Sequence, residues 1–215
     1  MKNLKTIIIL VTLLLFTQVV VAQLLPTFVI KGGVSSASLT TKDDYVKYSE
    51  VSDNRLGYTF GAGVEFPLNP LMSLETGLLY AQKGMKAESG GIKLEFSPTY
   101  LELPLGIKFK PTLANIGLYG TVGTYLGYGI GGETKGTFAG SVVSITGSDD
   151  IAWGSGKNDD LKPFDFGFNL AAGVILGQLE AGVYSSGSLI NISPVTKDGE
   201  TMRNIVFGVM FGFRI

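Results

Sequence analysis

Residues 57–66 read GYTFGAGVEF and alternate strictly between two kinds of side chain. The even positions are aromatic or aliphatic, whereas the odd positions are glycine, threonine and, at Glu65, a carboxylate. A period of two is the pattern of a β-strand, because successive side chains of a strand point to opposite faces of the sheet. One face of this strand is therefore apolar and the other is small or charged. The class of protein depends on which of these two faces is in contact with water.

The same alternation recurs along the chain and predicts eight strands, with no competing helical period. They cover residues 28–35, 56–66, 71–83, 101–110, 116–130, 164–176, 178–186 and 205–215. Their connections alternate between tight turns (67–70, 111–115 and 176–177) and long polar links (36–55, 84–99, 131–163 and 187–203). Short turns at one end and long loops at the other are typical of outer-membrane barrels, whose short turns are periplasmic. The sequence thus predicts an all-β, eight-stranded antiparallel up-and-down transmembrane β-barrel with both termini at the short-turn end.

The first residues have the features of an exported protein. Lys2 and Lys5 precede an apolar run over 6–21, and small residues lead up to Ala22. This arrangement predicts a cleaved signal peptide over residues 1–22, followed by a barrel domain over 23–215. An uncleaved membrane anchor is the alternative, but the apolar run is shorter than the roughly 20 residues of a spanning helix.

The composition excludes several classes of function. Removal of residues 1–22 takes away two of the 17 basic residues and leaves 15 against 18 acidic ones, so a nucleic-acid partner is not expected. The chain has no cysteine and no histidine, so it lacks disulfides, the commonest general base and every metal ligand except oxygen. We therefore expect no enzyme activity and no cofactor or metal site.

Two readings of the alternation differ in which face is outside. A secreted soluble barrel that binds an apolar ligand would place the apolar face inside. A membrane barrel places it outside, which explains why the other face is rich in glycine, since small residues leave room in a narrow lumen. Aromatic residues end the apolar stripes at both rims, as in interfacial girdles. They are Tyr58, Tyr80, Tyr128 and Phe164 near the long loops, and Phe28, Phe66, Phe109 and Phe213 near the short turns.

Several stretches resemble one family. The most specific are YLELPL at 100–105 and LLYAQKG at 78–84, with the closing strand from Val206 to Arg214 in support. On these residues the chain resembles the porin-family-like outer-membrane β-barrel proteins of Bacteroidota. The resemblance implies that the protein is located in the outer membrane of a Gram-negative bacterium, in contact with membrane lipid. It also implies insertion by the barrel-assembly machinery and periplasmic N- and C-termini. It implies no catalytic motif.

With the polar face inward, the lumen is predicted to hold charges of both signs. Mutual pairing is expected, because an unpaired charge in a confined interior costs several kcal/mol. We therefore expect a plugged lumen, filled further by Tyr119, Tyr125 and Tyr184, and a structural or surface-interaction role whose loop ligand is unknown. A narrow porin-like channel for small solutes is the alternative. The predicted ion-pair network consists of Lys31, Glu65, Glu75, Lys83, Glu102, Lys108, Lys110, Asp165, Glu180 and Arg214.

Three finer expectations concern register and loops. Across the turn at 67–70, Glu65 is expected opposite Ser73 and diagonal to Glu75, roughly 7–8 Å away. Residues 92–96 are expected to extend a hairpin above the membrane, with a bulge or bend at 97–98. The acidic pairs at 149–150 and 159–160, which flank Trp153, are expected to form a solvated loop rather than a calcium site.

Overall fold

The computed structural model describes residues 25–42, 53–113, 116–139, 144–194 and 200–215. The predicted signal peptide lies outside these residues and stays a prediction. Within the described ranges, no helix is long and apolar enough to cross a membrane.

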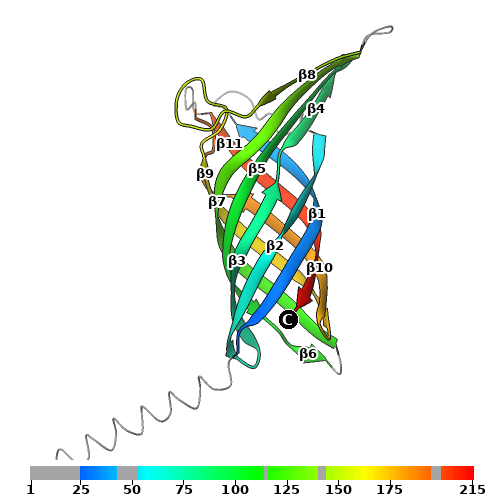
Figure 1. Cartoon of the computed structure of the whole chain (residues 1–215), viewed down its shortest axis with the longest axis vertical. Coiled ribbons are helices and arrows are strands. Elements are labelled where there is room, and N and C mark those ends of the chain that lie inside the picture. The colour runs from blue at the N-terminus through cyan, green and yellow to red at the C-terminus, as the bar shows by residue number, and fades with distance from the viewer. Residues whose placement is uncertain (1–24, 43–52, 114–115, 140–143, 195–199) are drawn as a thin grey trace, which may run out of the picture.

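Eight of the described strands pair in a closed antiparallel ring (Figure 1). Each strand pairs with its neighbour along the chain, and the first and last strands close the ring through an unbroken register from Val29–Arg214 to Lys42–Thr201. The ring consists of β1 (Thr27–Lys42), β2 (Asp53–Asn69), β3 (Met72–Gln82), β5 (Ile92–Phe109), β7 (Ile116–Ala139), β9 (Phe164–Leu176), β10 (Leu179–Ser188) and β11 (Thr201–Arg214). The expected all-β up-and-down barrel is thereby confirmed.

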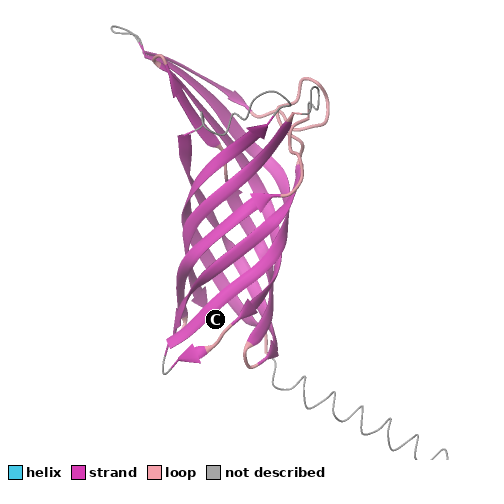
Figure 2. Cartoon of the chain, turned by 180° about the vertical axis from the view of Figure 1, so that it is seen from behind, coloured by secondary structure: helices cyan, strands magenta, loops and turns pink. Residues whose placement is uncertain are grey.

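Three shorter strands add to the ring at its two ends. β4 (Met85–Ser89) continues the line of β3 and pairs with β5, while β8 (Ser144–Asp150) pairs with the upper part of β7. Together these strands project beyond the barrel at the end away from the C-terminus (Figures 1 and 2). β6 (Thr112–Leu113) lies at the opposite end. Residues 92–96 thus form an extended hairpin, as the sequence predicts.

The two faces of the ring differ as the alternation predicts. In β2, Thr59 and Glu65 point into the lumen and are buried, whereas Phe60 between them is 52% exposed on the outside. In β11, Val206 is buried and Phe207 is 58% exposed. The outer wall is consequently a continuous apolar belt, a surface suited to lipid rather than to water.

One register prediction is wrong. Glu65 pairs directly with Glu75, and Ser73 lies opposite Pro67. The cause is local: the hairpin turns at residues 70–71, and an irregularity between Pro67 and Asn69 shifts the pairing. The two carboxylates are therefore cross-strand neighbours rather than diagonal ones, which increases their repulsion and their need for cations.

The bend predicted at residues 97–98 occurs slightly further along. The register of β5 with β7 shifts between Thr99 and Tyr100, where Ile130 is the extra residue on the β7 side. A bulge of this kind changes which side chains face inward beyond it. It also marks the level at which the projecting hairpins leave the barrel.

Candidate functional site in the barrel lumen

The lower half of the lumen contains a network of ion pairs centred on Glu65. Arg214 contacts both oxygens of this carboxylate, at 2.7 and 2.9 Å. The ammonium groups of Lys108 and Lys110 lie 2.7 and 2.8 Å from it. Because Glu65 is completely buried, these three cations replace the water that a carboxylate would otherwise require.

Lys108 joins this carboxylate to the rest of the network. Its Nζ lies 2.7 Å from Glu180 and 3.3 Å from Glu75, and 4.4 Å from the centre of the Tyr119 ring. We call the whole group the lower ionic layer: Lys31, Glu65, Glu75, Lys108, Lys110, Glu180 and Arg214. Lys31 completes it through Glu75 at 2.5 Å and Glu180 at 3.7 Å.

The strand register explains why these groups meet. Glu65 and Glu75 are opposed across β2 and β3, and Lys108 on β5 is paired with Ser73, two residues along β3 from Glu75. Glu180 on β10 lies opposite Gly212 of β11, where an added Cβ would collide with the glutamate side chain. Glycine at this position therefore makes room for a buried carboxylate.

A second network, the upper ionic layer, consists of Lys83, Glu102 and Asp165 with their polar partners. Lys83 Nζ lies 2.5 Å from Glu102 and 3.4 Å from Asp165. Asp165 Oδ2 also accepts hydrogen bonds from Tyr125 Oη at 2.9 Å and Ser188 Oγ at 2.9 Å. Asn204 Nδ2 adds a fourth contact at 3.1 Å. Several donors thus converge on one oxygen of this buried carboxylate and offset part of the cost of removing it from water.

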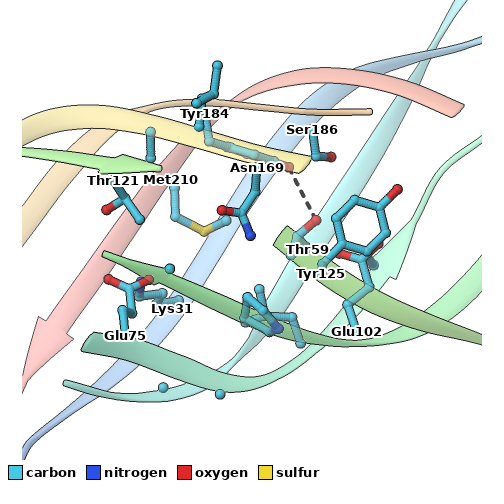
Figure 3. A pocket seen from close by; sticks show the side chains of 18 of the residues that line it. Lys31, Thr59, Glu75, Glu102, Thr121, Tyr125, Asn169, Tyr184, Ser186 and Met210 are labelled. Carbon is cyan, nitrogen blue, oxygen red and sulfur yellow. Dashed lines mark hydrogen bonds and ion pairs between the residues drawn. The ribbon is translucent and has the colours of Figure 1, made fainter. Parts of the chain in front are cut away.

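A chamber of about 90 Å³ separates the two layers (Figure 3). Glu75 and Lys31 lie at one end of it, and Glu102 and Tyr125 at the other. The hydroxyl group of Tyr184 lies 3.2 Å from that of Thr59 across its wall. The chamber has a largely apolar lining with a few polar groups and is large enough for several water molecules, but charged side chains close it at both ends.

An apolar cap covers the lumen above the upper layer. Leu39, Ile151, Leu161 and Ile192 form a buried cluster, against which Met85, Phe96, Trp153 and Met202 pack. Trp153 makes an edge-on contact with the Tyr100 ring, with 5.2 Å between centroids, and Tyr100 is itself fully buried. The segment that carries Ile151, Trp153 and Leu161 therefore folds back across the barrel mouth.

The prediction of a solvated acidic loop overlooked this cap. The missed signal was the group of large apolar side chains at 151, 153 and 161 among the acidic residues. Asp159 and Asp160 accept hydrogen bonds from the loop amides of Gly156 and Ala152, at 2.6 and 2.9 Å. Within the described residues, no group of three or more acidic side chains is placed to hold a metal ion.

The charged side chains of the projecting hairpins form pairs of their own. Lys86 Nζ on β4 lies 3.0 Å from Glu95 on β5, and Lys135 on β7 lies 2.7 Å from Glu133. The hydrogen bond from Lys86 lowers the pKa of the Glu95 carboxyl below its ordinary value. Because these pairs are partly exposed, they contribute little to stability.

All ten residues predicted as lumen charges lie in the two ionic layers. Tyr100, Ser188 and Asn204 belong to the same site, and Trp153 covers it from the cap, although no charge or alternation in the sequence marks these four as lumen residues. The predicted girdle residues lie on the outer wall: Tyr58 and Tyr80 stack with a centroid distance of 6.0 Å, and Tyr128 contacts Phe164 at 5.1 Å. Phe28, Phe66, Phe109 and Phe213 are exposed near the opposite rim. That these rings mark the membrane boundaries stays a prediction.

A closed ring of strands with an apolar outer wall and a charged lumen defines the class of outer-membrane β-barrel proteins. Residues 22–193 match the family model described as the outer membrane protein beta-barrel domain, and the chain belongs to this family. Membership places the protein in the outer membrane and excludes the soluble, ligand-binding barrel. No curated protein matches the chain significantly.

Several solved outer-membrane barrels align with most of this chain. The attachment invasion locus protein Ail of Yersinia pestis, in complex with the heparin analogue sucrose octasulfate, is 15% identical, with 88% of this chain and 99% of that chain covered and a TM-score of 0.40. OprG of Pseudomonas aeruginosa is 14% identical, with 88% and 95% covered and a TM-score of 0.46. Neisserial surface protein A is 8% identical, with 87% and 97% covered and a TM-score of 0.43. Identities this low carry no ligand or activity over to this chain.

Proposed function

We propose that the protein is a closed, non-conducting barrel with a structural or surface-interaction role, which holds its long hairpins at the cell surface. The observation that carries this proposal is the complete pairing of the ten lumen charges in two successive layers. An ion that crosses the lumen would have to break several buried pairs, each of which costs several kcal/mol to separate. The apolar cap adds a third barrier.

The proposed orientation places the projecting hairpins outside the cell and both termini in the periplasm. It rests on the rule that outer-membrane barrels have short periplasmic turns and long extracellular loops. Here the two-residue turns at 70–71 and 177–178 lie at the end of the barrel that carries the C-terminus. The projecting strands lie at the opposite end of the barrel.

We also propose that the protein is not an enzyme. The chain has no histidine and no cysteine, and each lumen carboxylate contacts at least one lysine or arginine. A carboxylate that is fully engaged in ion pairs is poorly suited to accept a proton from a substrate.

The test is conductance of the refolded protein in planar lipid bilayers. We expect no stable channels, whereas a trimeric porin reconstituted in the same way should give them. As a folding control, the unboiled sample should migrate differently from the boiled one on a denaturing gel. Stable openings of hundreds of picosiemens from gel-shifted protein would overturn the proposal.

A narrow channel for small solutes is the second candidate, and the open chamber between the layers favours it. In this case the two layers would be constrictions rather than seals. Liposome swelling with small sugars separates the two candidates. The channel is supported if the wild-type barrel causes swelling and variants such as Lys108→Ala change the swelling rate. The channel is excluded if neither the wild type nor these variants cause swelling.

A further inference from the structure

A groove of about 350 Å³ lies on the outer side of the barrel, where the projecting hairpins leave the wall. We call it the rim groove; among its lining residues are Arg55, Tyr58, Tyr80, Gln82, Glu133 and Asp150. It faces outward, because Tyr58 is 42% exposed on the outer wall, whereas its neighbour Thr59 is buried in the lumen. The groove is thus separate from the lumen and its ionic layers.

The backbone creates this groove. The extra residue at Ile130 shifts the pairing of β7 with β5 just below the groove. Two residues later, Gly132 has a φ of +141°, and a Cβ there would collide with the carbonyl oxygen of Ser97 and with Ile151. Only glycine fits this kink comfortably. The path of the backbone on the β7 side of the groove is therefore set by this glycine.

Arg55 is held in place at the inner wall of the groove. One of its terminal nitrogens donates to Gln82 Oε1 at 3.1 Å and to the carbonyl oxygen of Leu56 at 3.2 Å. Its Nε is buried and has no hydrogen-bond partner among the described residues. These contacts fix the orientation of the guanidinium, so its charge is presented to the groove without a further loss of side-chain freedom on binding.

The other polar groups of the groove carry both signs of charge. Glu133 and Asp150 are register partners on β7 and β8, and Lys135 pairs with Glu133. The hydroxyl side chains of Ser97 and Thr99 add small groups that both donate and accept. A bare phosphate would meet the two carboxylates, and a simple cation would meet Arg55. A ligand rich in hydroxyl groups satisfies donors and acceptors of both kinds.

An aromatic stack borders the groove. The rings of Tyr58, Phe60 and Tyr80 are nearly parallel, with centroid distances of 4.8 to 6.3 Å. Tyrosine rings with one apolar and one polar end are typical of the boundary between lipid and water. The polar groove therefore lies beside the rings that are predicted to mark the membrane surface.

We propose that the rim groove binds the sugar head group of a glycolipid in the outer leaflet, whose acyl chains lie along the apolar wall below. This inference deepens the proposed surface role and rests on it, because it takes the hairpin end to be the extracellular end. The sugar is recognised by Arg55, Gln82 and the carboxylates of β7 and β8. The aromatic stack contacts the region where sugar and acyl chains join.

Native mass spectrometry of the detergent-solubilised barrel tests this proposal, with a purified lipopolysaccharide of short sugar core as the probe. Phosphatidylglycerol and the free oligosaccharide are the comparison ligands. We expect the glycolipid to bind best and Arg55→Ala to weaken its binding about tenfold, the effect of losing one hydrogen bond to a charged group. Tyr80→Leu should also weaken binding, because the aromatic ring that contacts the ligand is lost. The matched controls are Arg203→Ala, an exposed arginine on β11, and Tyr128→Leu, a rim tyrosine that does not line the groove.

Three outcomes would overturn the proposal: equal binding by groove and control variants, equal binding of phosphatidylglycerol, or equally tight binding of the free oligosaccharide. The orientation on which it rests is tested separately. The Ser148→Cys variant, changed at an exposed position of β8, should react with an impermeant label on intact cells. Absence of labelling would contradict the proposed orientation, and channel activity in bilayers would contradict the closed barrel. Neither result would be confused with a failure of glycolipid binding.

Discussion

At the scale of single residues, Glu65 illustrates how a carboxylate is accommodated inside a membrane protein. It has no exposure to solvent, yet Lys108, Lys110 and Arg214 all lie within 3 Å of its oxygens. Its cross-strand neighbour Glu75 would repel it if these cations were absent. The cost of burying the two carboxylates is thus offset only while the cations remain.

Lys108 is the cation whose loss should matter most, because it is fully buried and contacts three carboxylates. We expect Lys108→Met to lower the free energy of unfolding by about 3–5 kcal/mol, since it leaves buried charges without compensation. Urea unfolding of the barrel refolded in detergent, followed by far-UV circular dichroism, measures the change. Lys110→Met is the matched control, because Lys110 is more exposed and contacts only Glu65. Equal losses in the two variants would contradict this account.

Glycines on the lumen face should be far less replaceable than those on the lipid face. A Cβ at Gly182 would collide with the carbonyl oxygen of Ala172 and the hydroxyl of Tyr119, whereas one at Gly120 meets only a backbone oxygen at 3.9 Å. We expect Gly182→Ala to lower the free energy of unfolding by about 1–3 kcal/mol through overpacking. Gly120→Ala should leave it nearly unchanged in the same urea experiment. A larger loss for Gly120→Ala would show that space for Tyr119 is not the reason for glycine at 182.

The sequence was sufficient to predict which residues face inward, because side-chain direction in a strand follows from a period of two. It could not predict which of the inward charges meet. The pairing of Lys108 with Glu180, 72 positions apart, depends on the order of strands around the ring and on the tilt of each strand. Similarly, Asn204 and Ser188 offered no charge signal, although both bind Asp165.

At the scale of elements, the cap is the feature that alternation does not reveal. Its apolar residues come from an irregular segment with no period, so their common burial is apparent only once the segment folds over the mouth. The register between β2 and β3 was also beyond prediction, because an irregularity at residues 67–69 shifts every pair above it. Turn geometry sets the register of a hairpin, and two prolines in four residues allow several geometries.

Trp153 reports on the integrity of the cap, because it is the single tryptophan of the chain and packs against the capping cluster. Leu161 is fully buried, and its backbone pairs with that of Trp153 in an isolated parallel β-bridge. We expect Leu161→Ala to shift the fluorescence emission of Trp153 to longer wavelength and to increase its quenching by acrylamide, since a cavity loosens the contacts around the ring. Leu189→Ala, at a half-exposed position, is the control and should change neither. An unchanged spectrum in the Leu161 variant would contradict a packed cap.

At the scale of the whole molecule, closure of the ring and balance of charge support each other. The lower layer holds four cations and three carboxylates, and the upper layer one cation and two carboxylates, so the lumen as a whole is neutral. Members of the lower layer come from β1, β2, β3, β5, β10 and β11 or their ends. The layer can therefore form only when strands from both ends of the chain are adjacent.

Closure itself can be tested with a disulfide, because the chain has no cysteine of its own. Ser36 on β1 and Phe207 on β11 are register partners, so cysteines at both positions lie within bonding reach in a closed ring. We expect Ser36→Cys with Phe207→Cys to oxidise within one molecule and to reduce the mobility change on boiling, because the ring can no longer open between its first and last strands. The control pairs Ser36→Cys with Phe211→Cys, on the same face of β11 but four residues away, about 13 Å along the strand. If a disulfide forms in the control variant and not in the matched pair, β1 and β11 meet in another register. If only disulfide-linked dimers form, the ring is closed by a second copy of the chain.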